Sequence, residues 1–250
     1  MSKPFKDAVD RLALRPSDDL LGEIVRRAAD QTVTDDDIAH LACRLAQSGL
    51  ILDLSNYGRT ADIASTGGPS SLSTLVCPLY LCELGYVVPK LTVPGRPAGS
   101  IDVLAQIPGY LIRLTDADVL RIISDVRYAH FVASDAFAPL DARLFSYRRL
   151  CGALDSPALV IASILAKKIA AGVETIGLDV RVAPHSSFGS TWGSARRNAR
   201  RFCRVAARLG RMAVCFLTDA RLPNQPFIGR VIAVLPELRR SFFAPRLPFD

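Results

Sequence analysis

The chain has 250 residues, of which 50% are hydrophobic and 22% charged, and its formal net charge is +7 at pH 7. This composition supplies enough apolar surface for a sizeable core and argues against a disordered chain. No apolar run approaches the ~20 residues of a membrane-spanning helix, and residues 1–19 lack the apolar centre and cleavage site of a secretory signal. We therefore expect a cytoplasmic protein with no membrane partner.

The first fifty residues predict three amphipathic helices, at 6–14, 17–29 and 34–47. From residue 60 onward, short apolar strands alternate with helices. The strands are expected at 60–64, 86–91, 129–133, 174–182 and 212–217, and the helices at 72–84, 100–107, 116–126, 140–150, 157–172 and 194–209. This alternation predicts an α/β fold with a largely parallel sheet. A proline-rich stretch with one short apolar element, 228–235, follows.

Two glycine-rich turns each lie between an expected strand and an expected helix. In the first, residues 65–71 read STGGPSS, and Ser65, Ser73 and Thr74 add hydroxyl donors near backbone amides that favour an anion. Because this turn matches neither a Walker loop nor a dinucleotide fingerprint, it is weak evidence alone. The second turn, 93–100, contains Arg96, which could bring positive charge to the same sheet edge. A plain proline–glycine connection explains it equally well.

The expected helix 157–172 carries Ser163 and Lys167 four residues apart, on one face. Arg148 lies near the end of the preceding helix. If the two helices fold back on each other, these three side chains become donors to one planar, carbonyl-rich ligand. The spacing alone favours a plainer interpretation, in which Lys167 caps the helix end, Ser163 packs and Arg148 is solvated.

The remaining residues predict neither a metal site nor nucleic-acid binding. Three separated histidines, and six cysteines without a CxxC pair, give no zinc-site spacing. Seven arginines crowd between 196 and 211, a pattern found in nucleic-acid-binding segments. Since apolar residues recur there at helical spacing, we favour the solvated face of an amphipathic helix, and nucleic acid is not an expected partner.

Several stretches, taken in order, resemble the thymidine and pyrimidine-nucleoside phosphorylase family over roughly residues 30–225. They are ASTGG at 64–68, GRPAGSIDVLAQIPGY at 95–110, APLD at 138–141, YRRLCGALDSPALVIASILAKKIAAG at 147–172, ETIGLDVRV at 174–182 and FLTDA at 216–220. The stretch around 155–168 is specific, whereas the two glycine-rich turns match only in part.

The resemblance implies a small helical domain that binds the base and a larger, mostly parallel α/β domain that binds phosphate. The helical domain would comprise 1–58 with 138–172, and the α/β domain 59–137 with 173–250. The family's base-binding residues fall on Arg148, Ser163 and Lys167, so the ligand interpretation now leads. The resemblance also implies a homodimer, and a chain that lacks the family's further C-terminal domain.

The phosphate end departs from the family. The family's loop begins Lys-His-Ser-Thr-Gly-Gly, whereas Ile63 and Ala64 occupy the first two positions here. The second loop is shorter, and Pro97 stands where a threonine phosphate ligand is expected. The candidates that remain for phosphate or sugar are Ser65, Gly67, Gly68, Ser73, Thr74, Thr92 and Arg96.

These observations predict a pentosyl-transfer enzyme that cleaves the N-glycosidic bond of a pyrimidine nucleoside, by phosphorolysis if phosphate binds. Phosphate is then a co-substrate, and no other cofactor is expected. If phosphate does not bind, water could replace it in a nucleoside hydrolase, with Asp62 and His185 as candidates to orient the water. Both residues also have a structural interpretation. The competing class is a non-catalytic protein that binds a pyrimidine base or nucleoside.

Overall fold

The computed structural model describes residues 3–29, 32–67, 72–95, 99–133 and 136–222. Its helices are α1 Lys3–Leu14, α2 Asp18–Ala29, α3 Asp35–Ala46, α4 Ser73–Glu83, α5 Ser100–Leu104, α6 Asp116–Val126, α7 Pro139–Leu150, α8 Pro157–Ala170 and α9 Trp192–Arg208. Its strands are β1 Ala61–Ser65, β2 Val88–Thr92, β3 Tyr128–Val132, β4 Thr175–Val182 and β5 Met212–Asp219. The expected elements of this part are confirmed, with shifts of a few residues at their ends. Gly68, Arg96 and Pro97 lie outside the described residues.

The strands form two parallel sheets instead of the single sheet expected. One has the order β1-β4-β5 and the other pairs β2 with β3. The two meet at an isolated parallel bridge between Thr60 and Val87. Beyond that bridge, the Ile63 carbonyl of β1 accepts a hydrogen bond from the buried ammonium group of Lys90 on β2. A side chain therefore occupies an acceptor that a continuous ladder would give to a backbone amide. The mixed α/β class with parallel strands is confirmed.

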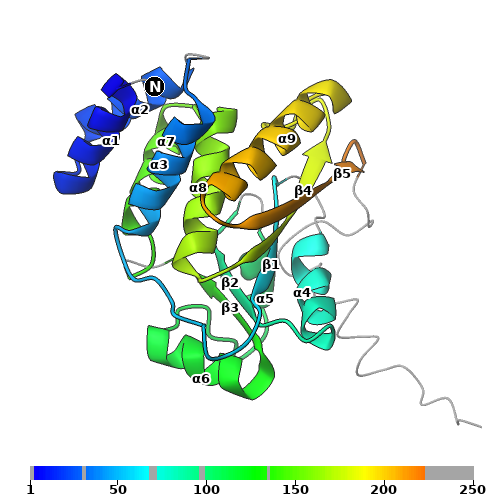
Figure 1. Ribbon diagram of the computed structural model, residues 1–250. Helices are drawn as coiled ribbons and strands as arrows, with labels where there is room; N and C mark the ends of the chain where they lie inside the picture. Colours follow the sequence, from blue (N-terminus) through cyan, green and yellow to red (C-terminus); the bar gives the residue numbers. More distant parts are fainter. Residues whose placement is uncertain (1–2, 30–31, 68–71, 96–98, 134–135, 223–250) are drawn as a thin grey trace, which may run out of the picture.

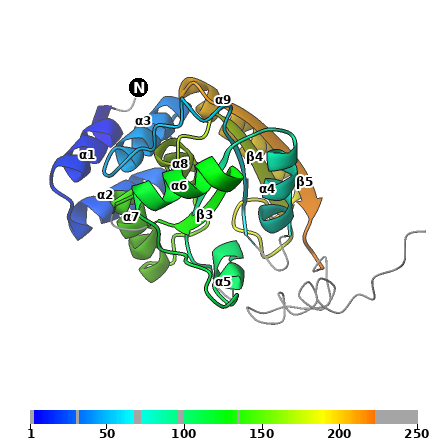
Figure 2. The same ribbon diagram turned by 90° about the horizontal axis from the view of Figure 1, so that it is seen from below.

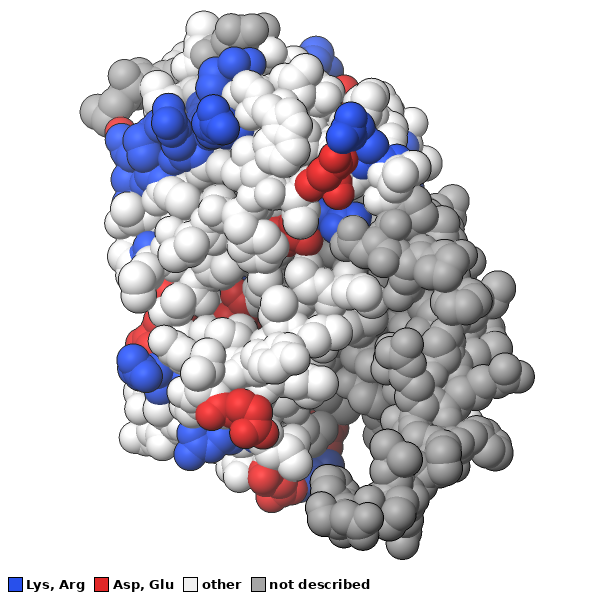
Figure 3. Space-filling view, turned by 90° about the vertical axis from the view of Figure 1, so that its right-hand side faces the viewer, with Lys and Arg blue, Asp and Glu red and all other residues white. Residues whose placement is uncertain are grey.

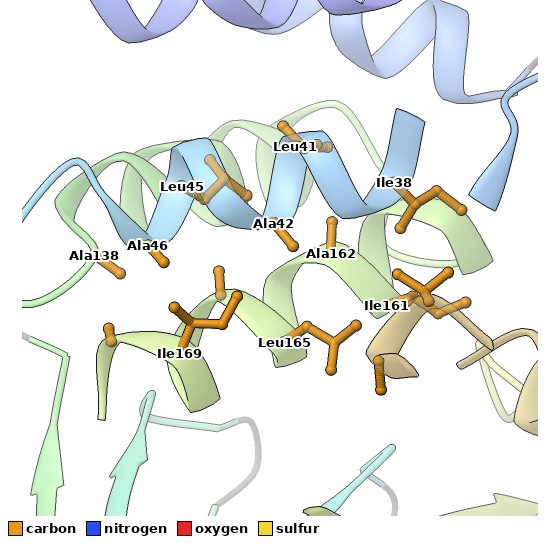
Figure 4. Packing of buried hydrophobic residues seen from close by; sticks show 14 of the residues in the cluster. Ile38, Leu41, Ala42, Leu45, Ala46, Ala138, Ile161, Ala162, Leu165 and Ile169 are labelled. Carbon is orange, nitrogen blue, oxygen red and sulfur yellow. The ribbon is translucent and has the colours of Figure 1, made fainter. Parts of the chain in front are cut away.

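A helical layer lies beside the sheets, where α1, α2, α3, α7 and α8 gather on one side of the molecule (Figure 1). Helix α3 packs along α8, and Ala42 of α3 points toward Ala162 of α8 in the core between them (Figure 4). Small alanines at this contact let the two helices approach closely. Helix α8 therefore stands between the other helices and the strands, where both of its sides are buried.

Helix α8 begins and ends where its sequence predicts. Pro157 occupies the first turn, where it costs no hydrogen bond. After the last turn, Gly172 adopts φ +70°, and its N–H bonds to the Ile169 carbonyl. A Cβ at this position would come within 2.7 Å of the Leu52 carbonyl oxygen, so only glycine fits without displacement. The end of α8 therefore fixes where Lys167 and Lys168 lie relative to the strands.

Helix α6 packs on β3 (Figure 2) and also contacts β2, whereas α4 packs mainly on β1, and α9 packs on β4 and β5. Helix α9 turns Phe202, Val205 and Ala206 inward, as expected of an amphipathic helix. On the face of the molecule seen in Figure 3, Lys and Arg side chains gather toward the upper left. Part of the arginine charge of α9 is neutralised by α3, because Asp35 bonds both Arg201 and Arg204.

Within the described ranges, each helix is too short or too polar to cross a bilayer. The expected division into a helical domain (1–58 with 138–172) and an α/β domain remains a prediction.

Candidate active site

The expected base end is a buried cluster between α7 and α8. The ammonium group of Lys167 donates to Ser163 Oγ at 2.8 Å and to Asp141 Oδ2 at 2.7 Å. The first contact follows from the four-residue spacing along α8; the second joins the two helices. Burial lowers the pKa of Lys167, and the nearby Asp141 carboxylate opposes this shift. Lys167 lies in the last turn of α8, as a capping residue would, but it is an enclosed cation that binds two side chains.

Arg148 is also enclosed, with 2% of its surface exposed. Its Nε donates to the Ala153 carbonyl at 3.1 Å and its Nη2 to the Leu154 carbonyl at 3.0 Å, so the guanidinium holds the α7–α8 connection. Burial lowers the pKa of Arg148, and Asp141 opposes this shift. The charge of Arg148 in turn lowers the pKa of Lys167. The structure therefore brings Arg148, Ser163 and Lys167 into one neighbourhood around Asp141.

A second buried ionic cluster joins the helical layer to the sheets. Asp62 of β1 accepts from Lys90 of β2 through Oδ1 at 2.9 Å and from Lys168 of α8 through Oδ2. Desolvation raises the pKa of Asp62, but the two lysines outweigh it and the net shift is downward. Because both carboxylate oxygens bind lysines and the residue is 1% exposed, Asp62 has a structural role. This arrangement supports the structural interpretation of Asp62 over a role in orienting water.

The first glycine-rich turn begins at the carboxyl end of β1. Ser65 Oγ accepts from the Gly67 N–H at 3.2 Å, and Gly67 takes φ +91°, which favours glycine. Ser73, at the start of α4, donates its hydroxyl to Asp179 Oδ2 at 2.7 Å. Thr74 follows in the first turn of α4 and is half-buried. The hydroxyl of Ser73 is thus engaged by β4.

The second turn is closed by Asp102, whose Oδ2 accepts from the N–H groups of Gly95 and Gly99 at 2.7 and 2.8 Å. At its two ends, Thr92 Oγ1 and Ser100 Oγ each lie 3.2 Å from His130 Nε2. Sequence analysis gave neither His130 nor Ser100 a role. A histidine inside an apolar strand gives little sequence signal, but Ser100 lies in the GRPAGSID stretch and could have been considered.

His185 lies in the connection between β4 and α9, and its side chain is exposed. It lines a cavity of about 490 Å³ bounded by Asp155, Pro157, residues 184–190, Ser194 and Asn198. It also lines a smaller one of about 110 Å³ with Thr66, Gly67 and Arg181. The smaller hollow lies at the carboxyl ends of β1, β4 and β5, and the larger one lies beside the segment that follows β4; ligands bind at such ends in parallel α/β folds. The described lining of the larger cavity does not include Arg148, Ser163 or Lys167.

No protein-family model matches the chain. It is 29% identical over 214 residues to the pyrimidine-nucleoside phosphorylase of Staphylococcus haemolyticus, a match that covers 84% of this chain and 48% of that enzyme. The phosphorylase of Staphylococcus epidermidis is 30% identical over 205 residues, covering 81% and 47%. That of Staphylococcus aureus is 31% identical over 214 residues, covering 84% and 48%. The chain is a divergent relative of the pyrimidine-nucleoside phosphorylases. It spans about half the length of the curated relatives it matches.

In this phosphorylase relative, the two buried clusters have the same charge composition. Lys167 binds the buried carboxylate of Asp141, with which Arg148 interacts only electrostatically, whereas Lys90 and Lys168 both bind the carboxylate of Asp62. Each cluster thus holds two cations and one buried carboxylate. An uncompensated buried cation is costly, and a ligand that carries or develops negative charge offsets that cost. Among the described residues, no group of three or more His, Cys, Asp and Glu is arranged to hold a metal ion.

Proposed function

We propose that this chain cleaves the N-glycosidic bond of a pyrimidine nucleoside, with Arg148, Ser163 and Lys167 at the base. The observation that carries this proposal is the buried cation excess around Asp141. As the glycosidic bond breaks, the electron pair stays with the pyrimidine and negative charge grows on its carbonyl oxygens. A fixed, desolvated cation stabilises that charge more than it stabilises the neutral nucleoside, which lowers the barrier.

The acceptor of the pentosyl group is phosphate or water. Phosphate would bind near Ser65, Gly67, Thr74 and Thr92, together with Gly68 and Arg96, which lie outside the described residues. The excess charge of Lys90 and Lys168 favours an anion at this end. With water as the acceptor, His185 is the remaining candidate to orient it, because it is exposed on the cavity at the carboxyl ends of the strands. Phosphorolysis leaves a pentose 1-phosphate, whereas hydrolysis leaves the free pentose.

The test is to incubate the chain with uridine, thymidine and cytidine, with and without phosphate, and to separate base, pentose and pentose 1-phosphate. Binding of uracil and thymine is measured in parallel. Arg148→Gln is compared with Arg149→Gln, which changes the exposed neighbouring arginine. We expect Arg148→Gln, Lys167→Met and Ser163→Ala to weaken base binding, and Arg149→Gln to leave it unchanged. Unweakened binding in Lys167→Met would refute the site.

A second candidate is a protein that binds pyrimidines without cleaving them. Ile63 and Ala64 favour it, because both side chains are apolar where the resemblance leads one to expect a lysine and a histidine. Tight base binding without release of pentose from any nucleoside, with or without phosphate, would support this candidate over the enzyme. A homodimer and a cytoplasmic location are further proposals for the chain.

A further inference from the structure

His130, on β3, connects the two ends of the second glycine-rich turn. It is 2% exposed, whereas Thr92 and Ser100 are half-buried. Its Nδ1 lies 3.0 Å from the Tyr128 hydroxyl, and its Nε2 lies 3.2 Å from both Thr92 Oγ1 and Ser100 Oγ. Both ring nitrogens are therefore used, each on a different side of the ring.

The imidazole of His130 is neutral. Burial lowers its pKa well below the ordinary value, and the charges of Lys90 and Lys168 lower it further, against an opposing effect of Asp62. Two tyrosines also lie beside His130: Tyr128, which contacts the ring, and Tyr110, whose hydroxyl is 3.5 Å from the His130 carbonyl oxygen. A neutral imidazole carries one N–H donor and one nitrogen lone pair, so the proton resides on either Nδ1 or Nε2.

Tyr128 bears on which nitrogen carries the proton. Burial raises the pKa of its phenol, so the hydroxyl keeps its proton and is able to donate it. Among the described residues, the hydrogen-bonding partner of this hydroxyl is His130 Nδ1. The phenol is partly buried, and an acceptor for its proton is favourable there, which favours the lone pair on Nδ1 and the imidazole proton on Nε2. The Nε2–H then donates to the oxygens of Thr92 and Ser100. Their own hydroxyl protons cannot point back at the ring.

We propose that His130 is a positioning residue, which through its Nε2–H turns the Thr92 and Ser100 hydroxyls into paired donors for an oxyanion such as phosphate. The inference rests on the proposed function, in which phosphate is the co-substrate. Two outward hydroxyls bind an oxyanion without adding charge, and the nearby excess of Lys90 and Lys168 supplies the electrostatic attraction. The chain would thereby replace part of the binding that a lysine at position 63 would give.

The tautomer is tested by ¹⁵N NMR of the full chain labelled at its three histidines, with His130→Gln to identify the signal. We expect the neutral Nε2–H form of His130, unchanged between about pH 6 and pH 8. Tyr128→Phe removes the hydroxyl that fixes the tautomer, so the signal should shift toward a mixture of the two forms. A wild-type signal from the Nδ1–H form, or from the imidazolium, would overturn the proposal.

The role in binding is tested by calorimetric titration of the full chain with inorganic phosphate and, separately, with uracil. His130→Phe should weaken phosphate binding by about tenfold or more and leave uracil binding unchanged, which also shows that the variant is folded. His130→Gln, whose side-chain amide can still donate to the hydroxyls, should retain most of the affinity. Tyr128→Phe should lower it a few-fold. His40→Gln, on α3, is the matched control and should bind phosphate as the wild type does.

Equal phosphate affinity in His130→Phe and wild type would overturn the proposal, and so would a wild-type chain that binds no phosphate. The proposed function fails on a different result, namely no cleavage of any pyrimidine nucleoside with or without phosphate. A chain that hydrolyses nucleosides but does not bind phosphate keeps the function and loses this inference. A chain that binds phosphate through His130 but cleaves no nucleoside keeps this inference and loses the proposed function.

Discussion

Asp62→Asn is expected to destabilise the fold strongly, although it changes one side chain by a single atom. Both oxygens of this carboxylate bind lysines, Lys90 at 2.9 Å and Lys168 on the other side. All three side chains are almost fully enclosed. An asparagine keeps the shape but leaves two buried ammonium groups facing each other without a negative charge.

The size of the effect follows from charge and distance. At an effective dielectric constant of about 20, the Lys90–Asp62 separation of 2.9 Å corresponds to roughly 6 kcal/mol. The lost energy is smaller, because a buried lysine can release its proton, which costs about 5 kcal/mol from an ordinary pKa at neutral pH. Breaking one buried pair typically costs about 3–5 kcal/mol, so we expect at least that loss for Asp62→Asn.

Urea unfolding followed by circular dichroism measures this loss. Glu23→Gln is the surface control: Glu23 pairs with Arg11 and Arg27 near solvent, and its loss should cost less than about 1 kcal/mol. A triple change of Asp62, Lys90 and Lys168 to Leu, Met and Met should recover most of the stability, because no unpaired charge remains. If Asp62→Asn costs no more than Glu23→Gln, the cluster does not stabilise the fold as argued.

Three further predictions concern pH, backbone and surface charge. The pKa of Lys90 is lowered to about 8, so between about pH 8 and 10.5 the folded chain binds fewer protons than the unfolded one. Over that range the unfolding free energy of wild type should rise by up to about 3 kcal/mol relative to that of Lys90→Met. A difference between the two proteins that does not change with pH would contradict this. Gly172→Ala should cost about 2–3 kcal/mol by thermal unfolding, since its Cβ would lie 2.7 Å from the Leu52 carbonyl oxygen. The control Gly85→Ala, at φ +82° with open space around it, should cost about 1 kcal/mol. Equal losses would show that a small shift of the backbone removes the close contact at little cost. Asp35→Asn should lower the unfolding free energy by about 1–2 kcal/mol in low salt and by less in high salt, because it removes the carboxylate that pairs with Arg201 and Arg204. A loss that does not depend on salt would show that packing, and not charge, explains the effect.

Local patterns in the sequence predicted most of the elements. Thr34 and Thr115 each form a capping box with an aspartate three residues later, and these helices begin where expected. The division into two sheets could not be predicted in this way. It coincides with a contact between Lys90 and the Ile63 carbonyl, which joins two strands through a side chain. The alternation of apolar residues predicts where the strands lie, but it does not predict which strands pair with each other.

The candidate site divides along the same line. Ser163 and Lys167 follow from spacing within one helix, and their contact at 2.8 Å is the kind that a pattern predicts. The partners Asp141 and Asp62 come from other elements, 26 and 106 residues away from the lysines that they bind. Their roles depend on tertiary packing, so the sequence leaves Asp62 between a structural role and the orientation of water, and it gives Asp141 no role.

Ile63 stands where the resemblance leads one to expect a lysine, and the position of the Lys90 charge explains this difference. A Cβ at Gly177 would lie 3.2 Å from Ile63 Cγ1, so Ile63 packs against β4 and fills space between two strands. A cation still reaches this position, because the ammonium group of Lys90 binds the Ile63 carbonyl from the neighbouring strand. That cation belongs to a cluster with one carboxylate for two lysines. The excess charge is relieved either by loss of the Lys90 proton or by a nearby anion. Anion binding should therefore raise the pKa of Lys90 toward its ordinary value and stabilise the fold at the same time.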